Sequence, residues 1–320
     1  MIVARRTLRG STLAWLVAAS FGLNLVMSAP AEARHEIELA QGLAQDFQFF
    51  DLAKQILQEE LQRAITRNDD GLKIRVALAM NGVLLMEAEL AQRRGDTAEA
   101  ERLRREAREV MERHAGTSAR GEVNIRGAKL QEALALVRAA ESSTEQDERT
   151  RLRAEAIKLL REVRDGFKAT VERLRPRQRE ITQEQELEAL RMSWYYWAQA
   201  AYELAKLQDQ REENLRTVVT QMDELAFEFD GTFVAFWGAL LRGDALALQG
   251  AYGRALGEYR AIIDTLPVRV EGEQANVPGL QAAIDQLRLD AYYKMALAFL
   301  SMRNDADVIQ TVDTMLRDYP

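Results

Sequence analysis

Apolar side chains recur at intervals of three and four along most of the chain beyond residue 34, and rarely at intervals of two. That period places them on one face of an α-helix, whereas a period of two would indicate a strand. Ala, Leu, Glu, Gln and Arg are abundant, and the 320 residues include five prolines, a composition that favours helices. The pattern therefore predicts an all-α fold.

Helix-breaking segments divide this pattern at regular places. They are Asn68–Gly71, Arg94–Asp96, Ala115–Ser118, Ser142–Thr144, Pro176, Asp230–Thr232, Gln249–Gly250 and Pro267–Gly279. The predicted antiparallel helix pairs are 35–47 with 50–67, 72–94 with 97–114, 123–141 with 148–175, 183–208 with 212–229, 232–249 with 252–266, and 280–302 with 305–318. One pair alone leaves its apolar face exposed, so consecutive pairs must stack into a solenoid. We divide the chain into N-terminal pairs (34–122), an irregular long pair (123–182) and C-terminal pairs (183–320).

Two sets of residues in the C-terminal part repeat the same intervals of 12, 4 and 8. They are Gly243, Ala255, Tyr259 and Pro267, and then Ala296, Val308, Val312 and Pro320. A small residue in a first helix lets the second helix approach closely, and a bulky residue one turn later fills the gap to the next pair. Proline ends the second helix because it cannot continue one.

These intervals resemble those of the 34-residue tetratricopeptide repeat. The likeness is strongest over 236–267 and 289–320, fair over two N-terminal segments that begin at Gln41 and Ala88, and weak over 123–175 and 194–229. The resemblance implies a right-handed superhelical solenoid whose concave groove binds a protein or peptide. Because one fold serves many functions, this step to function is an analogy.

In that family the first helix of each repeat lines the groove. The corresponding positions here are Tyr195, Tyr202, Trp237, Leu240, Asp244, Asp290, Tyr293 and Leu297. Four of them are Tyr or Trp, which anchor partners well because they bury a large area with few rotatable bonds. The alternative is that these aromatic side chains pack between repeats.

The first 33 residues have the features of a secretory signal peptide. A basic start containing Arg5, Arg6 and Arg9 precedes the mostly apolar run Leu13–Val26, and Ala31–Ala33 fits a cleavage site. We expect cleavage after Ala33 and export to the periplasm or cell envelope. The alternative is an uncleaved segment that tethers the protein to a membrane.

The net charge indicates which classes of partner the protein can bind. Without its first 33 residues the chain has 40 basic and 49 acidic residues, a net charge of −9, and such a balance argues against general nucleic-acid binding. The surplus is uneven, at +5 over 93–180 and −10 over 181–320, which can steer a charged partner.

The sequence offers little for catalysis. It has no cysteine and two histidines, of which His35 follows the expected cleavage site and His114 ends a helix, where it would complement the helix dipole. Glu184, Glu186 and Glu188 fit the acidic start of a helix. No phosphate-binding loop or nucleophile motif occurs. We therefore expect no cofactor, no metal and no enzyme activity. The alternative is the helical, non-catalytic part of a larger cell-envelope enzyme or of a membrane-tethered assembly.

The repeat pattern reaches Pro320 without a polar capping helix. A stacked array needs such a cap because its terminal pair otherwise exposes apolar surface. We expect Val308, Ile309, Val312, Met315 and Leu316 to be partly uncovered. Either a longer repeat protein continues there, or this end docks on another subunit.

Overall fold

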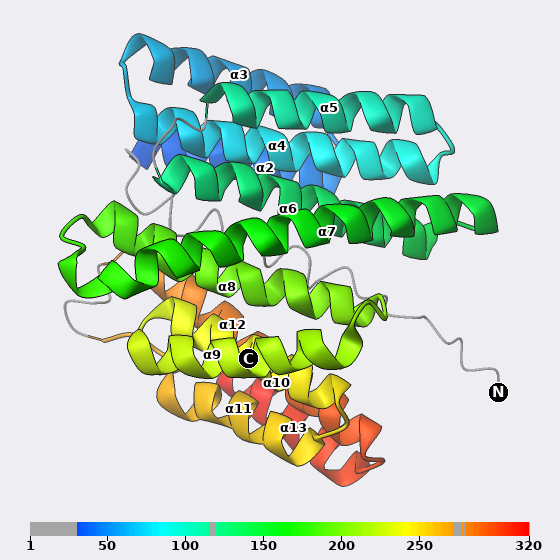
Figure 1. Cartoon of the computed structure of the whole chain (residues 1–320), viewed down its shortest axis with the longest axis vertical. Coiled ribbons are helices and arrows are strands. Elements are labelled where there is room, and N and C mark those ends of the chain that lie inside the picture. The colour runs from blue at the N-terminus through cyan, green and yellow to red at the C-terminus, as the bar shows by residue number, and fades with distance from the viewer. Residues whose placement is uncertain (1–30, 115–118, 272–276, 278, 320) are drawn as a thin grey trace. The chain divides into compact units, whose positions relative to one another are not determined.

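The computed structural model describes residues 31–114, 119–271, 277 and 279–319, and within them every regular element is helical (Figure 1). The α-helices are α2 (Ala31–Phe47), α3 (Phe50–Thr66), α4 (Asp70–Arg93), α5 (Thr97–His114), α6 (Ala119–Ser142), α7 (Gln146–Leu174), α8 (Glu184–Lys206), α9 (Arg211–Glu228), α10 (Phe233–Leu248), α11 (Tyr252–Thr265), α12 (Leu280–Ser301) and α13 (Asp305–Asp318). Each helix of a predicted pair is present. The predicted all-α fold, a run of helix pairs that pack in sequence order, is confirmed.

Local signals explain where the helices begin and end. The Asp69 carboxylate accepts a hydrogen bond from the Leu72 amide at 2.8 Å and caps α4, and Asn304 caps α13 in the same way. Gly95 and Gly250 adopt φ values of +82° and +80° in the turns after α4 and α10, a conformation that glycine tolerates best. One element was not predicted: a 3-10 helix, η1 (Arg175–Glu180), extends α7 through Pro176.

The helices belong to two compact units. Unit 1 contains residues up to 116 together with 131–152, and unit 2 contains 117–130 together with 153–320. Consequently α6 and α7, expected as a separate irregular pair, each contribute to both units. In unit 1, Arg138 of α6 bonds to Glu89 of α4 at 2.9 Å, and Glu148 of α7 accepts a bond from Gln92 of α4 at 2.7 Å.

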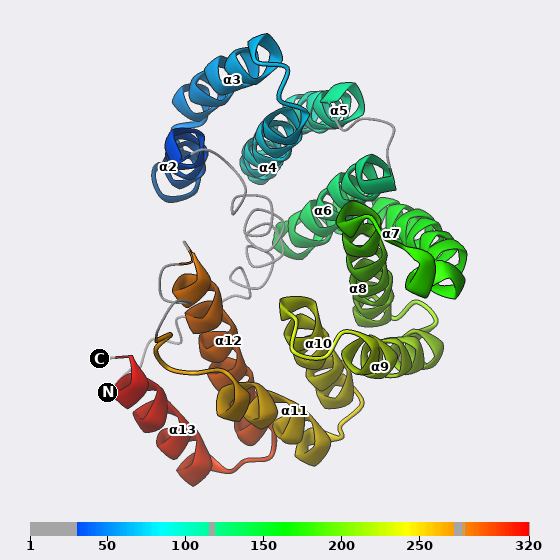
Figure 2. The same ribbon diagram turned by 90° about the vertical axis from the view of Figure 1, so that its left-hand side faces the viewer.

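Unit 2 arranges its C-terminal pairs in two layers (Figure 2). The first helices α8, α10 and α12 form one layer, in which α10 packs against both neighbours. The second helices α9, α11 and α13 form the other layer, and each packs on its own first helix. The side chain of Ala255, predicted to lie where two helices touch, is fully buried in the core shared by α10, α11 and α12.

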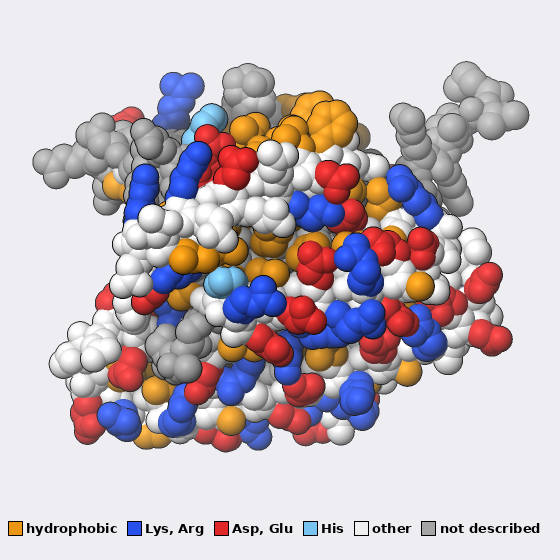
Figure 3. Space-filling model, turned by 90° about the horizontal axis from the view of Figure 1, so that it is seen from above, with side chains coloured by type: hydrophobic (Ala, Val, Ile, Leu, Met, Phe, Trp, Pro, Cys, Tyr) orange, Lys and Arg blue, Asp and Glu red, His pale blue; other side chains and the backbone are white. Residues whose placement is uncertain are grey.

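Several basic side chains of 93–180 form ion pairs with acidic side chains of the same segment. Arg102 pairs with Glu99 and Glu106 along α5, and Arg108 reaches Glu132 of α6. Arg173 of α7 pairs with Glu122 of α6 at 3.1 Å. The face seen in Figure 3 shows basic and acidic side chains interspersed. This segment therefore carries a mixed-charge surface.

The predicted signal peptide lies almost entirely outside the described residues, which begin at Ala31. In the part of the chain that the structure covers, no helix is both long enough and apolar enough to cross a membrane.

Candidate functional site

An aromatic contact joins α8 to α10. The ring centroid of Tyr195 lies 6.0 Å from that of Trp237, and the ring centroid of Phe233 lies 6.5 Å from that of Trp237. Tyr195 also contacts Tyr196 at 5.5 Å. Tyr195 is 8% exposed, whereas Trp237 is half-buried. Tyr195 and Trp237 therefore pack against each other between successive pairs, and Trp237 also reaches the surface.

A buried ion pair lies beside this aromatic contact and joins α10 to α12. Asp244 of α10 pairs with the ammonium of Lys294, and its other carboxylate oxygen accepts a hydrogen bond from the Tyr259 hydroxyl at 2.8 Å. The side chains of Asp244 and Lys294 are 11% and 7% exposed. Opposite charges this far from water interact strongly, and each would be costly alone. The contact therefore fixes α12 against the pair α10–α11.

Asp290 is a second carboxylate one turn before Lys294 on α12. Burial raises its pKa to about 6, although Lys294 and a 3.2 Å hydrogen bond from Gln286 act in the opposite direction. The charge of Asp244 on α10 adds to the rise. A carboxyl group with this pKa carries a charge at neutral pH at an energetic cost, which a cation from outside would relieve.

Tyr202 and Gln199 extend the polar surface along α8, on the same helical face as Tyr195. The negative charge of Asp244 adds to the burial that raises the pKa of Tyr202, so the Tyr202 hydroxyl stays protonated. Lys206 lies over the Tyr202 ring at 5.7 Å. Gln199 is 5% exposed, and its buried carbonyl oxygen has no hydrogen-bond partner among the described residues.

The α12 end of this surface is open to solvent. Tyr293 and Leu297 lie one turn apart on α12, and each is 42% exposed. We call the surface formed by these residues the α8–α10–α12 strip. Its members are Tyr195, Gln199, Tyr202, Trp237, Asp244, Asp290, Tyr293, Lys294 and Leu297.

The predicted groove residues thus fall into two groups. Tyr202, Trp237, Asp244, Asp290, Tyr293 and Leu297 reach solvent to differing extents. Tyr195 and Leu240 are each 8% exposed, and Leu240 belongs to the core of α10, α11 and α12.

Two contacts at the strip and one of its residues escaped the sequence reasoning. Lys294 follows Asp290 by four residues, a spacing that suggests a pair within α12, yet its ion-pair partner is Asp244 on α10. Tyr259 was assigned only as a gap-filling residue, and its hydroxyl also bonds to Asp244. Gln199 carried no sequence signal beyond its spacing from Tyr195 and Tyr202.

The residues weighed for other chemistry lie elsewhere. His35 is exposed. Burial, Arg113 and Lys73 lower the pKa of His114 at the end of α5. The neutral imidazole is therefore favoured there, which weakens the dipole role expected of it. Glu188 pairs with Arg120 of α6 at 3.4 Å. In the described ranges, no group of three or more His, Cys, Asp or Glu side chains is placed to hold a metal ion.

No protein-family model matches this chain, and no curated protein matches it.

Proposed function

We propose that this protein is an exported, non-catalytic scaffold of the tetratricopeptide-like kind, and that it binds a protein or peptide partner along the α8–α10–α12 strip. The observation that carries the proposal is the composition of the strip. Tyr293 and Leu297 are partly exposed and follow Asp290 by three and seven residues on one face of α12. The half-buried Trp237 lies on α10, which packs against α12. Interfaces place large anchors next to a few polar groups in this manner.

The fixed geometry of the strip supports binding without rearrangement. The Asp244–Lys294 ion pair and the Tyr195–Trp237 contact tie together three helices that each present part of the strip. A partner would therefore meet a surface whose side chains are already held in place. Pre-organisation of this kind lowers the entropy lost on binding.

The chemistry of the strip favours a partner with an apolar side chain followed by a cation. Tyr293 and Leu297 offer the apolar contact, and Asp290 offers a carboxylate that is costly to ionise without a partner. The net charge of −10 over 181–320 favours the approach of a basic segment. The N-terminal features that resemble a signal peptide support a location of this interaction in the periplasm or cell envelope.

Site-specific photo-crosslinking tests this proposal. A photoreactive amino acid replaces Tyr293 or Leu297 in the full chain, and envelope extract from the source cells supplies partners. The matched control replaces Phe227, which is 85% exposed on α9 in the other layer. We expect a discrete crosslinked protein from positions 293 and 297 and none from 227. Equal crosslinking from all three positions, or none from any, would contradict the proposal.

A further inference from the structure

An exposed apolar stripe runs along α13. Ile309, Val312 and Leu316 are 62%, 36% and 56% exposed. Their spacing of three and four places them on one side of the helix. We call these three residues the α13 stripe. None of them belongs to the α8–α10–α12 strip.

The preceding helix pair shows what such positions do in this fold. The repeat offset of 53 residues, which relates Gly243 to Ala296 and Tyr259 to Val312, maps Leu256, Tyr259 and Ile263 onto the α13 stripe. Leu256 and Tyr259 are 9% and 2% exposed. They share their core with Ile284, Leu287 and Ala291 of α12. The α13 stripe therefore occupies positions that, one repeat earlier, lie in or against the core shared by α10, α11 and α12.

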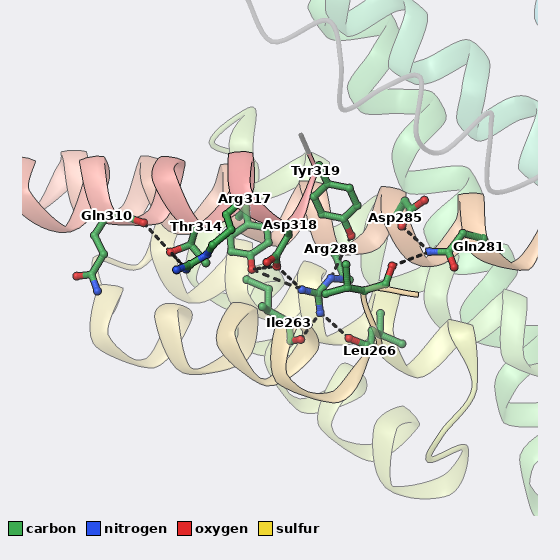
Figure 4. Close-up of polar contacts among 12 residues, drawn as sticks. Ile263, Leu266, Gln281, Asp285, Arg288, Gln310, Thr314, Arg317, Asp318 and Tyr319 are labelled. Atoms are coloured by element: carbon green, nitrogen blue, oxygen red, sulfur yellow. Dashed lines mark hydrogen bonds and ion pairs between the residues drawn. The ribbon is translucent and has the colours of Figure 1, made fainter. Parts of the chain in front are cut away.

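Arg288 of α12 holds α13 in a fixed orientation (Figure 4). Its buried guanidinium donates hydrogen bonds to the carbonyl oxygens of Ile263 and Leu266 at the end of α11. The same group donates to Asp318 at 2.7 Å and to the Tyr319 hydroxyl at 3.0 Å. The end of α13 is thereby joined to α12 and α11, and the stripe faces outward from a rigid support.

The two ends of α13 carry exposed charges of opposite sign, with Asp313 between them. Asp318, also in the last turn, is paired with Arg288. Asp305 and Asp307 lie in its first turn, and Arg317 lies in its last turn. Arg317 and Asp305 are exposed. Two such helices packed antiparallel bring each acidic end against the basic end of the other and also oppose their dipoles.

We propose that the α13 stripe is the contact through which two copies of this chain form a two-fold symmetric dimer. In an antiparallel arrangement centred between Val312 and Asp313, Ile309 of each copy packs against Leu316 of the other. Arg317 of each copy then lies within about one turn of Asp305 of the other, since the helix rises about 1.5 Å per residue. A two-fold interface uses the same patch on both subunits, so the assembly stops at the dimer.

Sedimentation velocity on the full chain tests the dimer, with the same N-terminus in every variant. We expect a concentration-dependent dimer for the parent chain. Ile309→Glu with Leu316→Glu should be a monomer of unchanged helicity. The matched control, Leu39→Glu, alters a side chain that is 42% exposed on α2 in unit 1 and should leave the dimer intact. A monomeric parent chain, or a dimer insensitive to both stripe substitutions, would overturn the proposal.

Charge variants test the antiparallel geometry. Arg317→Glu should raise the dissociation constant about threefold or more at low salt, and adding Asp305→Arg should restore it. The two Asp313 side chains lie near the two-fold axis, so Asp313→Asn should tighten the dimer. A parallel or irregular association would show no rescue by the double reversal, and that result would overturn the antiparallel arrangement. Because the α13 stripe and the α8–α10–α12 strip share no residue, either proposal can fail alone.

Discussion

A β-carbon placed on Gly243 of α10 would lie 2.4 Å from Cε1 of the Tyr259 ring on α11. Carbon atoms do not approach so closely, so the ring occupies space that only glycine leaves free. This contact sets the separation of α10 and α11. It also lets the Tyr259 hydroxyl donate a hydrogen bond to Asp244, the residue that follows Gly243 on α10.

Gly243→Ala should therefore destabilise the protein by about 1–3 kcal/mol through overpacking, even though alanine favours helices. The matched control is Gly257→Ala on α11, where an added β-carbon meets no atom within 4 Å. That control should gain about 0.5–1 kcal/mol because glycine is a poor helix former. Urea unfolding followed by circular dichroism measures both. Equal stabilisation by the two substitutions would show that the Tyr259 ring can move aside without loss of stability.

Lys294→Met should destabilise unit 2 by about 3 kcal/mol, because it leaves the Asp244 carboxylate buried without its cation. Adding Asp244→Asn should recover most of the loss, since the asparagine oxygen still accepts the bond from Tyr259. Thermal and urea unfolding of the single and double variants measure the coupling free energy between Asp244 and Lys294. If the double variant is no more stable than Lys294→Met alone, the ion pair does not control this contact.

Asp290 should make stability fall as the pH rises from about 4 to about 6. Burial raises its pKa to about 6, above the usual value of about 3.9 for an unfolded chain. Over that range the folded state binds more protons than the unfolded state. The free energy of unfolding therefore falls as the pH rises. Lys294 and Gln286 on its own helix, Asp244 on α10 and Tyr195 on α8 are the groups that interact with it.

Asp290→Asn should accordingly raise the unfolding midpoint at pH 7.5, and this gain should vanish near pH 4. Unfolding curves at a series of pH values measure the difference between the two proteins. Asp264→Asn, at an exposed position on α11, serves as the control for loss of one negative charge. If Asp264→Asn raises the unfolding midpoint equally at pH 7.5, the effect comes from the change in net charge and not from the burial of Asp290.

Trp237→Ala and Tyr293→Ala should each weaken partner binding by about 1 kcal/mol or more. Tyr293 is 42% exposed, so its loss should leave the fold intact. Trp237 also contacts Tyr195, so Trp237→Ala should cost some stability as well. Binding titrations with the crosslinked partner, alongside circular dichroism, separate the two effects. Unchanged affinity in the Tyr293 variant would place the partner elsewhere.

The sequence by itself determined the helices. Breakers such as Arg94–Asp96 and Gln249–Gly250 act through local backbone preferences, so they were readable without a structure. The repeat spacing also identified Ala255 as a contact residue, and that side chain is fully buried. Both features depend on residues a short distance apart in the chain, where a helix imposes a known geometry.

Only the tertiary structure decided which charged groups meet. Asp244 and Lys294 are 50 residues apart, and Arg288 joins Asp318, 30 residues away, to carbonyl groups of α11. Helix periodicity gives the face of each side chain and leaves open the rotation of one helix against another. That rotation is set by the packing of whole faces, such as the Tyr259 ring against Gly243. Tyr195 and Tyr293, assigned alike from their repeat positions, are 8% and 42% exposed, and Tyr195 packs against Trp237 of the next pair.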